Sequence, residues 1–302
     1  MFVKAERKRS KLRLALIGPS GSGKTYSALL IAQGLGGKIA MLDSERGSGS
    51  LYSDMVDYDI SNLAPPFTPE RYIEAINQAQ EAGYNLLIID SLSHAWSGQG
   101  GILEFVDRAS QVQKNNFAAW REASPKHNAL VDAILGADMH IIVTMRSKTV
   151  WEVQKDEKTG KTRPVKIGLA PVQRDGLEYE FTCVLELSVD GHIATATKDR
   201  TRLFDGRYIT PDIETGEVLK QWLTGTGEKP AELLNEIMGQ MFKLGLGSKL
   251  SEYESYVQGK YGSDLKGLTY SQLKEQIGSL ERCHKDKKLL EKFREYLIKH
   301  AA

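Results

Sequence analysis

The stretch that decides the fold is Gly18-Pro19-Ser20-Gly21-Ser22-Gly23-Lys24-Thr25. It lies between an apolar run over residues 12–17 and a segment with helical spacing over residues 24–35. The pattern G-x-x-x-x-G-K-[ST] is that of a phosphate-binding loop, or P-loop. Its glycines let successive backbone N–H groups point at phosphate oxygens, and the following helix adds the positive end of its dipole. Because a strand precedes the loop and a helix follows it, we predict a nucleoside triphosphate site here.

The loop assigns a task to each polar residue at its end. Lys24 places a positive charge on the β and γ phosphates, and the Thr25 hydroxyl is a ligand for Mg²⁺. Asp90 ends the apolar run NLLIID, and a carboxylate at that point holds the Mg²⁺ shell through water. We therefore expect ATP and Mg²⁺ as cofactors. The expected nucleotide-contacting residues are Gly18, Pro19, Ser20, Gly21, Ser22, Gly23, Lys24, Thr25 and Tyr26.

The composition is that of an ordinary globular chain of 302 residues, with 41% hydrophobic and 26% charged residues. The net charge is +1, so an argument for nucleic-acid binding must rest on local patches. Cys183 and Cys283 lie far apart, which disfavours a disulfide framework and fits a reducing cytoplasm. No run of eighteen apolar residues occurs, so we expect no membrane span and a cytoplasmic protein.

Apolar runs alternate with helical patterns along the first part of the chain. Continuous apolar strands that are separated by helices predict a parallel sheet with both faces covered. Two later runs alternate around Asp190-Gly191, which predicts a hairpin that extends the sheet with antiparallel strands. Ser124-Pro125 resembles the start of a helix. The expected strands are residues 12–17, 38–43, 85–90, 139–145, 181–187 and 192–197, and the expected helices are residues 24–35, 69–82 and 125–135.

The last quarter of the chain differs in character from the rest. Leu233, Ile237 and Met241 repeat at helical spacing, and Thr269 and Gln272 form a capping box before another helical pattern. We expect an α/β core with a mainly parallel sheet flanked by helices, followed by a small helical domain. The expected divisions are a basic arm over residues 1–11, an ATPase domain over 12–224, a linker over 225–230 and a helical domain over 231–302.

Three further features narrow the function. Glu45 lies just past the second strand, in the phrase MLDSE, and Lys198-Asp199-Arg200 follows the late hairpin. Residues 146–174 carry eight Lys or Arg against three acids, with Trp151 among them, directly after the strand over residues 139–145. Basic residues for phosphates and an aromatic ring for base stacking are typical of a surface for single-stranded DNA.

Together these features resemble the phage-encoded RecA-like ATPases of the Sak type, which act in single-strand annealing recombination. The resemblance spans roughly residues 10–225. Its most telling phrases are VTMRSK over residues 143–148, APVQR over 170–174 and TKDRT over 197–201. The chain departs from the pattern at Arg146, which stands where a polar sensor usually follows the fourth strand. We also expect no N-terminal domain like those of the larger recombinases.

The resemblance implies a RecA-like core and a set of roles. Glu45 would activate the attacking water, with Asp43 as the other candidate. Lys198 and Arg200 would reach a neighbouring subunit's γ-phosphate and act there with that subunit's own P-loop lysine, which is Lys24. The basic segment would bind single-stranded DNA through Arg146, Lys148, Trp151, Lys155, Lys158, Lys161 and Arg163. The expected partners are single-stranded DNA, further copies of the chain in a ring or filament, and a single-strand-binding protein or annealase that docks on the C-terminal helices.

Three alternatives share the P-loop. A small-molecule phosphotransferase is disfavoured by the position of Glu45 and by the late K-x-R element. A ring helicase or loader has the same core. An ATP-gated DNA-binding module with little turnover would carry the same motifs, so the sequence does not separate it from an active ATPase.

Overall fold

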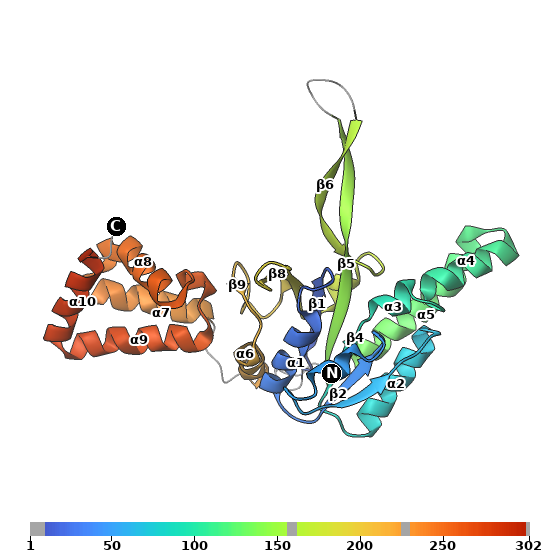
Figure 1. The fold of residues 1–302 in the computed structure, drawn as a ribbon, viewed down its shortest axis with the longest axis horizontal. Helices are drawn as coiled ribbons and strands as arrows, with labels where there is room; N and C mark the ends of the chain where they lie inside the picture. Colours follow the sequence, from blue (N-terminus) through green and yellow to red (C-terminus); the bar gives the residue numbers. More distant parts are fainter. Residues whose placement is uncertain (1–9, 156–161, 225–229, 300–302) are drawn as a thin grey trace, which may run out of the picture.

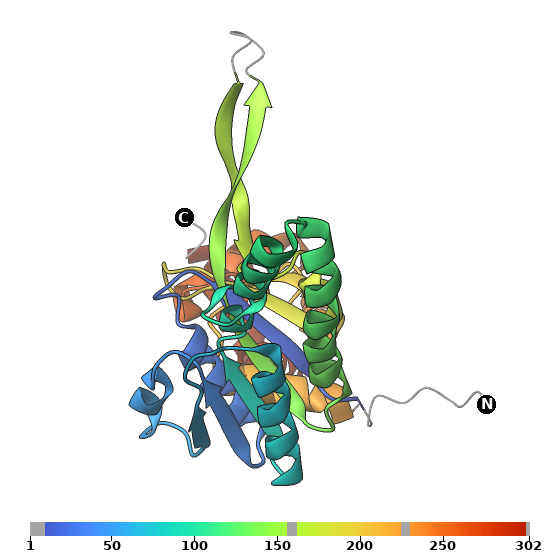
Figure 2. The same cartoon turned by 90° about the vertical axis from the view of Figure 1, so that its right-hand side faces the viewer.

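The structure, a computed structural model, describes residues 10–155, 162–224 and 230–299. These residues form an α/β core from which one long hairpin projects, with a group of C-terminal helices at one side (Figure 1). Figure 2 shows the same hairpin standing clear of the core when the molecule is turned by 90°. Among the described residues, no helix is long and apolar enough to cross a membrane.

Within the described residues, nine strands form the central sheet in the order β3-β2-β4-β5-β1-β7-β8-β9, with β6 paired to β5. The pairs from β3 to β7 are parallel, whereas β6, β8 and β9 are antiparallel to their partners. The strands are β1 Arg13–Gly18, β2 Ile39–Asp43, β3 Asp59–Asn62, β4 Leu86–Asp90, β5 His140–Lys155, β6 Thr162–Pro171, β7 Cys183–Leu187, β8 Ala194–Asp199 and β9 Tyr208–Ile209. In this order β5 separates the P-loop strand β1 from β4, which ends in Asp90. The predicted fold class, an α/β core with a mainly parallel sheet flanked by helices and followed by C-terminal helices, is confirmed.

Both faces of the sheet are covered by helices, as the continuous apolar strands predict. Leu14 and Leu16 belong to the buried cluster on the α1 and α6 face, and Ala15 and Ile17 belong to the cluster on the α2 and α5 face. Successive side chains of a strand point to opposite faces, so a strand buried on both sides is apolar throughout. The core helices are α1 Lys24–Leu35, α2 Pro69–Glu81, α3 Ser93–Ser97, α4 Ile102–Gln113, α5 Asn116–Gly136 and α6 Ile213–Thr224.

The predicted helix start at Ser124-Pro125 is wrong. Helix α5 begins at Asn116, with the Asn115 side chain accepting hydrogen bonds from two N–H groups of the first turn, and Pro125 lies inside the helix. An interior proline costs about 3 kcal/mol. Here the buried face of α5 continues on both sides of it, from Ala119 and Ala123 to Leu130 and Ile134. Packing of this face offsets the lost backbone hydrogen bond.

Strands β3, β6 and β9 were not expected, and β5 is longer than expected. Strand β5 does not end at the sheet edge but continues to Lys155, where it pairs with β6 as the projecting hairpin. Strand β3, with the sequence DISN, is polar and largely exposed because it is the edge strand beside β2. A short polar edge strand has no apolar pattern, so the sequence does not reveal it.

The C-terminal helices enclose a core of their own. They are α7 Pro230–Lys243, α8 Leu250–Tyr261, α9 Tyr270–Lys285 and α10 Lys287–Lys299, and α8 was not expected. The capping box of Thr269 and Gln272 is present at the start of α9. The group contacts the α/β core through Arg207, which donates to the carbonyls of Lys266, at 2.8 Å, and Leu268.

Candidate active site

The P-loop joins β1 to α1 at the carboxyl end of the parallel strands. Helix α1 begins at Lys24, and its N-cap Gly23 has a left-handed backbone with φ 83°, which glycine adopts without strain. The Lys24 ammonium donates to the carbonyl of Pro19 at 2.8 Å, which folds the side chain back over its own loop. Burial lowers the pKa of Lys24, and the carboxylates of Asp90 and Glu45 oppose that shift.

Thr25 and Asp90, which were predicted to hold Mg²⁺, lie in contact with each other. The Thr25 hydroxyl donates to Asp90 Oδ2 at 2.6 Å, and the Thr144 hydroxyl donates to Oδ1. Burial raises the pKa of the Asp90 carboxyl, and these two hydrogen bonds oppose the rise. Two adjacent hard oxygens beside the phosphate loop fit Mg²⁺, which takes few protein ligands alongside phosphate oxygens. When bound, the ion would neutralise charge on the phosphates.

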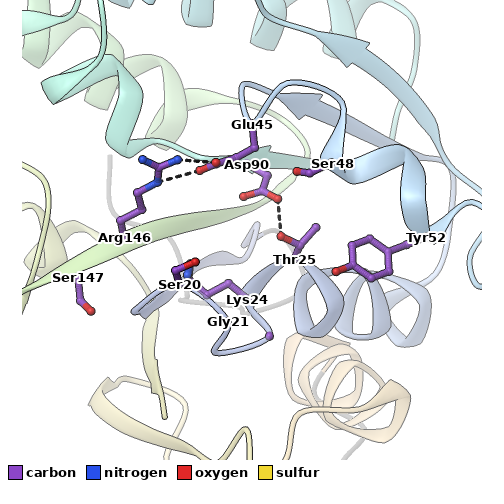
Figure 3. A pocket seen from close by; sticks show the side chains of 11 residues that line it. Ser20, Gly21, Lys24, Thr25, Glu45, Ser48, Tyr52, Asp90, Arg146 and Ser147 are labelled. Carbon is purple, nitrogen blue, oxygen red and sulfur yellow. Dashed lines mark hydrogen bonds and ion pairs between the residues drawn. The ribbon is translucent and has the colours of Figure 1, made fainter. Parts of the chain in front are cut away.

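A cavity of about 530 Å³ opens above the loop (Figure 3). It brings together P-loop residues, the strand-end carboxylates and residues that were not predicted, namely Ser48, Tyr52 and Ser147. Tyr52 belongs to a 3-10 helix over Ser48–Tyr52 that follows β2, and its ring lies edge-on to that of Tyr26, with centroids 6.1 Å apart. The lining residues are Ser20, Gly21, Gly23, Lys24, Thr25, Glu45, Ser48, Tyr52, Asp90, Arg146 and Ser147.

Glu45 points into this cavity and is held there by Arg146. The guanidinium of Arg146 donates from Nε to Oε1 at 3.0 Å and from Nη2 to Oε2 at 2.5 Å, so both carboxylate oxygens are engaged (Figure 3). Burial alone would raise the pKa of Glu45. The hydrogen bonds and charge of Arg146 prevail, and the pKa lies below its ordinary value. A carboxylate in this state is a weak proton acceptor.

Arg146 was expected among the DNA contacts, but its side chain lies in the nucleotide cavity. Its backbone stands where β5 leaves the sheet to become the hairpin. The Arg146 N–H donates to Ser93 Oγ at 2.9 Å, and its carbonyl accepts from the Val172 N–H, just past the end of β6, at 2.7 Å. The root of the hairpin and the side chain on Glu45 therefore belong to the same residue.

Asp43, the other candidate for the catalytic carboxylate, has a different environment. It is 1% exposed, and its carboxylate accepts the backbone N–H groups of Glu45, at 2.5 Å, and Gly49, at 2.9 Å. These bonds fix the loop that carries Glu45. Asp43 is not among the residues that line the cavity, so the geometry favours Glu45.

His94 was not predicted and lies beside Glu45. Its Nε2 is 4.0 Å from Glu45 Oε1, its Nδ1 is 2.8 Å from Ser44 Oγ, and its ring stacks on Phe67 at 4.9 Å. Burial lowers the pKa of His94, which favours the neutral ring. No local pattern marks this residue. Thr144 did carry a signal, because it is a polar residue inside the otherwise apolar run that starts β5.

Lys198 and Arg200 lie at the far end of β8, outside the cavity of their own subunit. The Lys198 ammonium donates to the Glu178 carbonyl at 3.2 Å and to the Tyr179 carbonyl, and Arg200 donates to the Tyr179 carbonyl at 3.3 Å. Neither residue lines the nucleotide cavity. Their role as trans cations stays a prediction.

The other expected DNA contacts belong to the hairpin. Lys148 is exposed on β5. Trp151, Lys155 and Arg163 lie in β5 and β6, where the structure describes the backbone and its pairing but not these side chains. Lys158 and Lys161 lie outside the described residues.

Residues 10–210 match the AAA domain family. The chain belongs to this family. No curated protein matches the chain. A solved structure described as the RadB recombinase aligns at 18% identity over 58% of this chain and 73% of that chain, with a TM-score of 0.29. The matched residues contain the P-loop, Asp90, Glu45 and Arg146. The chain therefore has a nucleotide-binding P-loop ATPase domain of the AAA family.

Proposed function

We propose that the protein is an ATPase whose hydrolysis is coupled to single-stranded DNA on the β5–β6 hairpin, in recombination or annealing of the phage Sak type. The observation that carries the proposal is the position of Arg146. This residue engages both oxygens of Glu45 and also forms the root of the hairpin. A change at the hairpin therefore reaches Glu45, the group that activates water in this proposal, through the backbone of Arg146 and its ion pair with the carboxylate.

The chain supplies a group for each part of the hydrolysis. Lys24 and the P-loop amides hold the phosphates, and Thr25 holds Mg²⁺ while Asp90 holds its shell through water. Glu45 orients the attacking water and accepts its proton. While Arg146 occupies both carboxylate oxygens, Glu45 accepts that proton poorly. The γ-phosphate of bound ATP is a second anion for the guanidinium, so ATP competes with Glu45 for Arg146.

DNA acts on the same residue from the other side. Lys148 follows Arg146 by two positions in β5, so the two side chains leave the strand on the same face. A phosphate bound by Lys148 and by the basic residues farther along the hairpin pulls on the strand that positions Arg146. The structure has the Glu45–Arg146 pair closed, which is the resting arrangement in this proposal.

The remaining proposals concern assembly. Lys198 and Arg200 complete a neighbour's nucleotide site in a ring or filament of identical chains. The helices beyond residue 230 recruit a single-strand-binding protein or annealase in the cytoplasm. In this division residues 12–224 form the ATPase domain and residues 225–230 the linker.

The test is the steady-state ATPase rate with oligothymidylate, with duplex DNA of the same length and without DNA. We expect single-stranded DNA to raise the rate several-fold and duplex DNA to raise it less, because bases stack on the hairpin only when they are unpaired. ATP turnover that ignores single-stranded DNA would contradict the coupling. Transfer of the γ-phosphate to a small acceptor instead of water would replace the proposal with a phosphotransferase.

A further inference from the structure

The turn between β7 and β8, over residues 188–193, lies directly against the P-loop. Strand β7 runs parallel to β1, so its carboxyl end reaches the place where the loop begins. A Cβ atom on Gly18 would lie 2.7 Å from the carbonyl oxygen of Leu187. A Cβ atom on Gly23 would lie 3.2 Å from Nδ1 of His192. The end of β7 therefore lies against the first glycine of the loop, and the turn lies against the last.

His192 holds an unfavourable backbone conformation in this turn. Its φ is 51° and that of Gly191 is 64°, so two consecutive residues are left-handed, as a type I′ turn requires. Ser188 closes the turn, since its N–H donates to the Ile193 carbonyl at 2.9 Å and its hydroxyl accepts from the Ile193 N–H at 3.2 Å. Glycine or asparagine suits such a position, whereas histidine is strained there. Backbone strain of this kind is often retained at positions where the side chain has a function.

The place of the His192 ring beside Gly23 limits the function that this side chain can have. Gly23 lines the nucleotide cavity and His192 does not. The ring therefore lies close to the glycine without forming part of the cavity wall. It fills the space that a side chain would occupy at the N-cap of α1, where φ is 83°. A ring in this place restricts the movement of Gly23 without touching the phosphates.

We infer that His192 is a positioning residue for the P-loop. It holds Gly23, and through it the loop amides, in the phosphate-binding shape before the nucleotide arrives. The inference rests on the proposed nucleotide binding. A loop that is ordered in advance loses less freedom on binding, so removing the ring weakens affinity by about 5- to 10-fold. The loss applies to every ligand that uses the loop, including one with no nucleoside.

The test compares His192→Gly with Lys114→Gly. Lys114, at the C-cap of α4, has the same φ of 51° and lies outside the nucleotide cavity. Glycine relieves backbone strain in both variants, so both should unfold at the same or a higher temperature than the original chain. Calorimetric Kd values for ATP and for inorganic tripolyphosphate, both with Mg²⁺, are then measured. We expect His192→Gly to raise the Kd of both ligands by about the same factor. Lys114→Gly should leave both Kd values unchanged.

The outcomes separate the possible failures. Unchanged affinity of the His192→Gly protein for both ligands would overturn the positioning role. Weaker binding of ATP with unchanged binding of tripolyphosphate would also overturn it, because the ring would then act on the nucleoside. If the original chain binds neither ligand, it is the proposed nucleotide binding that fails. That result is distinct from a failure of the role of His192. Stability that falls together with affinity in His192→Gly alone would assign the ring to folding and contradict the inference.

Discussion

Two hairpins rise from the same sheet and meet the nucleotide site at different groups. The β5–β6 hairpin reaches Glu45, the carboxylate that we propose activates water, because Arg146 at its root engages both of its oxygens. The β7–β8 hairpin reaches the P-loop, because the end of β7 lies against Gly18 and the turn lies against Gly23. In our proposals, hydrolysis and nucleotide binding are therefore controlled by separate elements. Changes in the first hairpin should alter turnover, and changes in the second should alter affinity.

The largest effect is expected at Glu45 itself. Glu45→Gln removes the proton acceptor and leaves the phosphate cradle intact, so hydrolysis should fall by about 10² to 10⁴-fold while ATP affinity is kept. Single-turnover ATPase and calorimetry measure the two quantities.

Asp43→Asn is the matched control for this variant. It keeps a side chain of the same size beside the N–H groups of Glu45 and Gly49, but its single amide oxygen accepts from only one of them, so one bond is lost and the other is weakened. We expect a loss of stability and a smaller loss of turnover. If Asp43→Asn has the larger kinetic effect with ATP binding preserved, Glu45 is the wrong carboxylate.

A mixing experiment tests whether the second hairpin also serves a neighbour. Lys24→Ala lacks phosphate binding but keeps Arg200, and Arg200→Ala keeps a complete P-loop, so each protein alone should be inactive. In a random co-assembly with head-to-tail contacts, about a quarter of the sites combine a good P-loop with a good trans cation. The ATPase rate of the mixture should rise accordingly. No recovery in mixtures that are shown to co-assemble would contradict the trans role.

Charge removal on the first hairpin should have a moderate effect that is confined to DNA. Replacing Lys155, Lys158 and Lys161 with alanine should leave ATP affinity unchanged. It should reduce the salt dependence of DNA binding by a log–log slope of about 2, since each lost phosphate contact contributes about 0.7 for a single strand. Fluorescence anisotropy over a series of salt concentrations measures this slope. An unchanged slope would show that these lysines do not contact phosphate.

The sequence predicts those parts of the site that are local in the chain. The P-loop, the strand that ends in Asp90 and the glutamate after β2 are each defined by a few consecutive residues. Arg146 could not be paired with Glu45 in advance, because the two are 101 positions apart and meet only through the order of strands. His192 is hidden for the same reason, since its place against Gly23 depends on how β7 pairs with β1. Pro125 misled the prediction because packing of α5 outweighs a local rule.

The smallest expected effect is a pH dependence of folding stability. It arises at His140, in the central sheet from which both hairpins extend. Burial first, and then the charges of Lys11 and Arg13, lower the pKa of His140 to about 4, and its Nδ1 accepts the Leu12 N–H at 2.9 Å. The unfolded chain binds this proton near pH 6.5, so stability is complete above that pH and is lost as pH falls towards 4.

His140→Gln keeps a hydrogen-bond acceptor but does not titrate. Between pH 7 and pH 5 the variant should lose about 1 kcal/mol less unfolding free energy than the original chain, after allowance for the partial exposure of the ring. Urea unfolding at the two pH values measures the difference. Equal losses in both proteins would mean that His140 is not the titrating group.

The most direct test of the coupling is the DNA dependence of the ATPase rate in Arg146→Ala, with Arg146→Lys as the variant that keeps the charge without the two-pronged contact. Freed from the guanidinium, Glu45 should hydrolyse ATP without DNA at a rate approaching the DNA-stimulated rate of the original chain. Single-stranded DNA should then add little further stimulation. Anisotropy checks that the variant still binds DNA. If Arg146→Ala binds DNA and is stimulated by the same factor as the original chain, Arg146 is not the link between the hairpin and the active site.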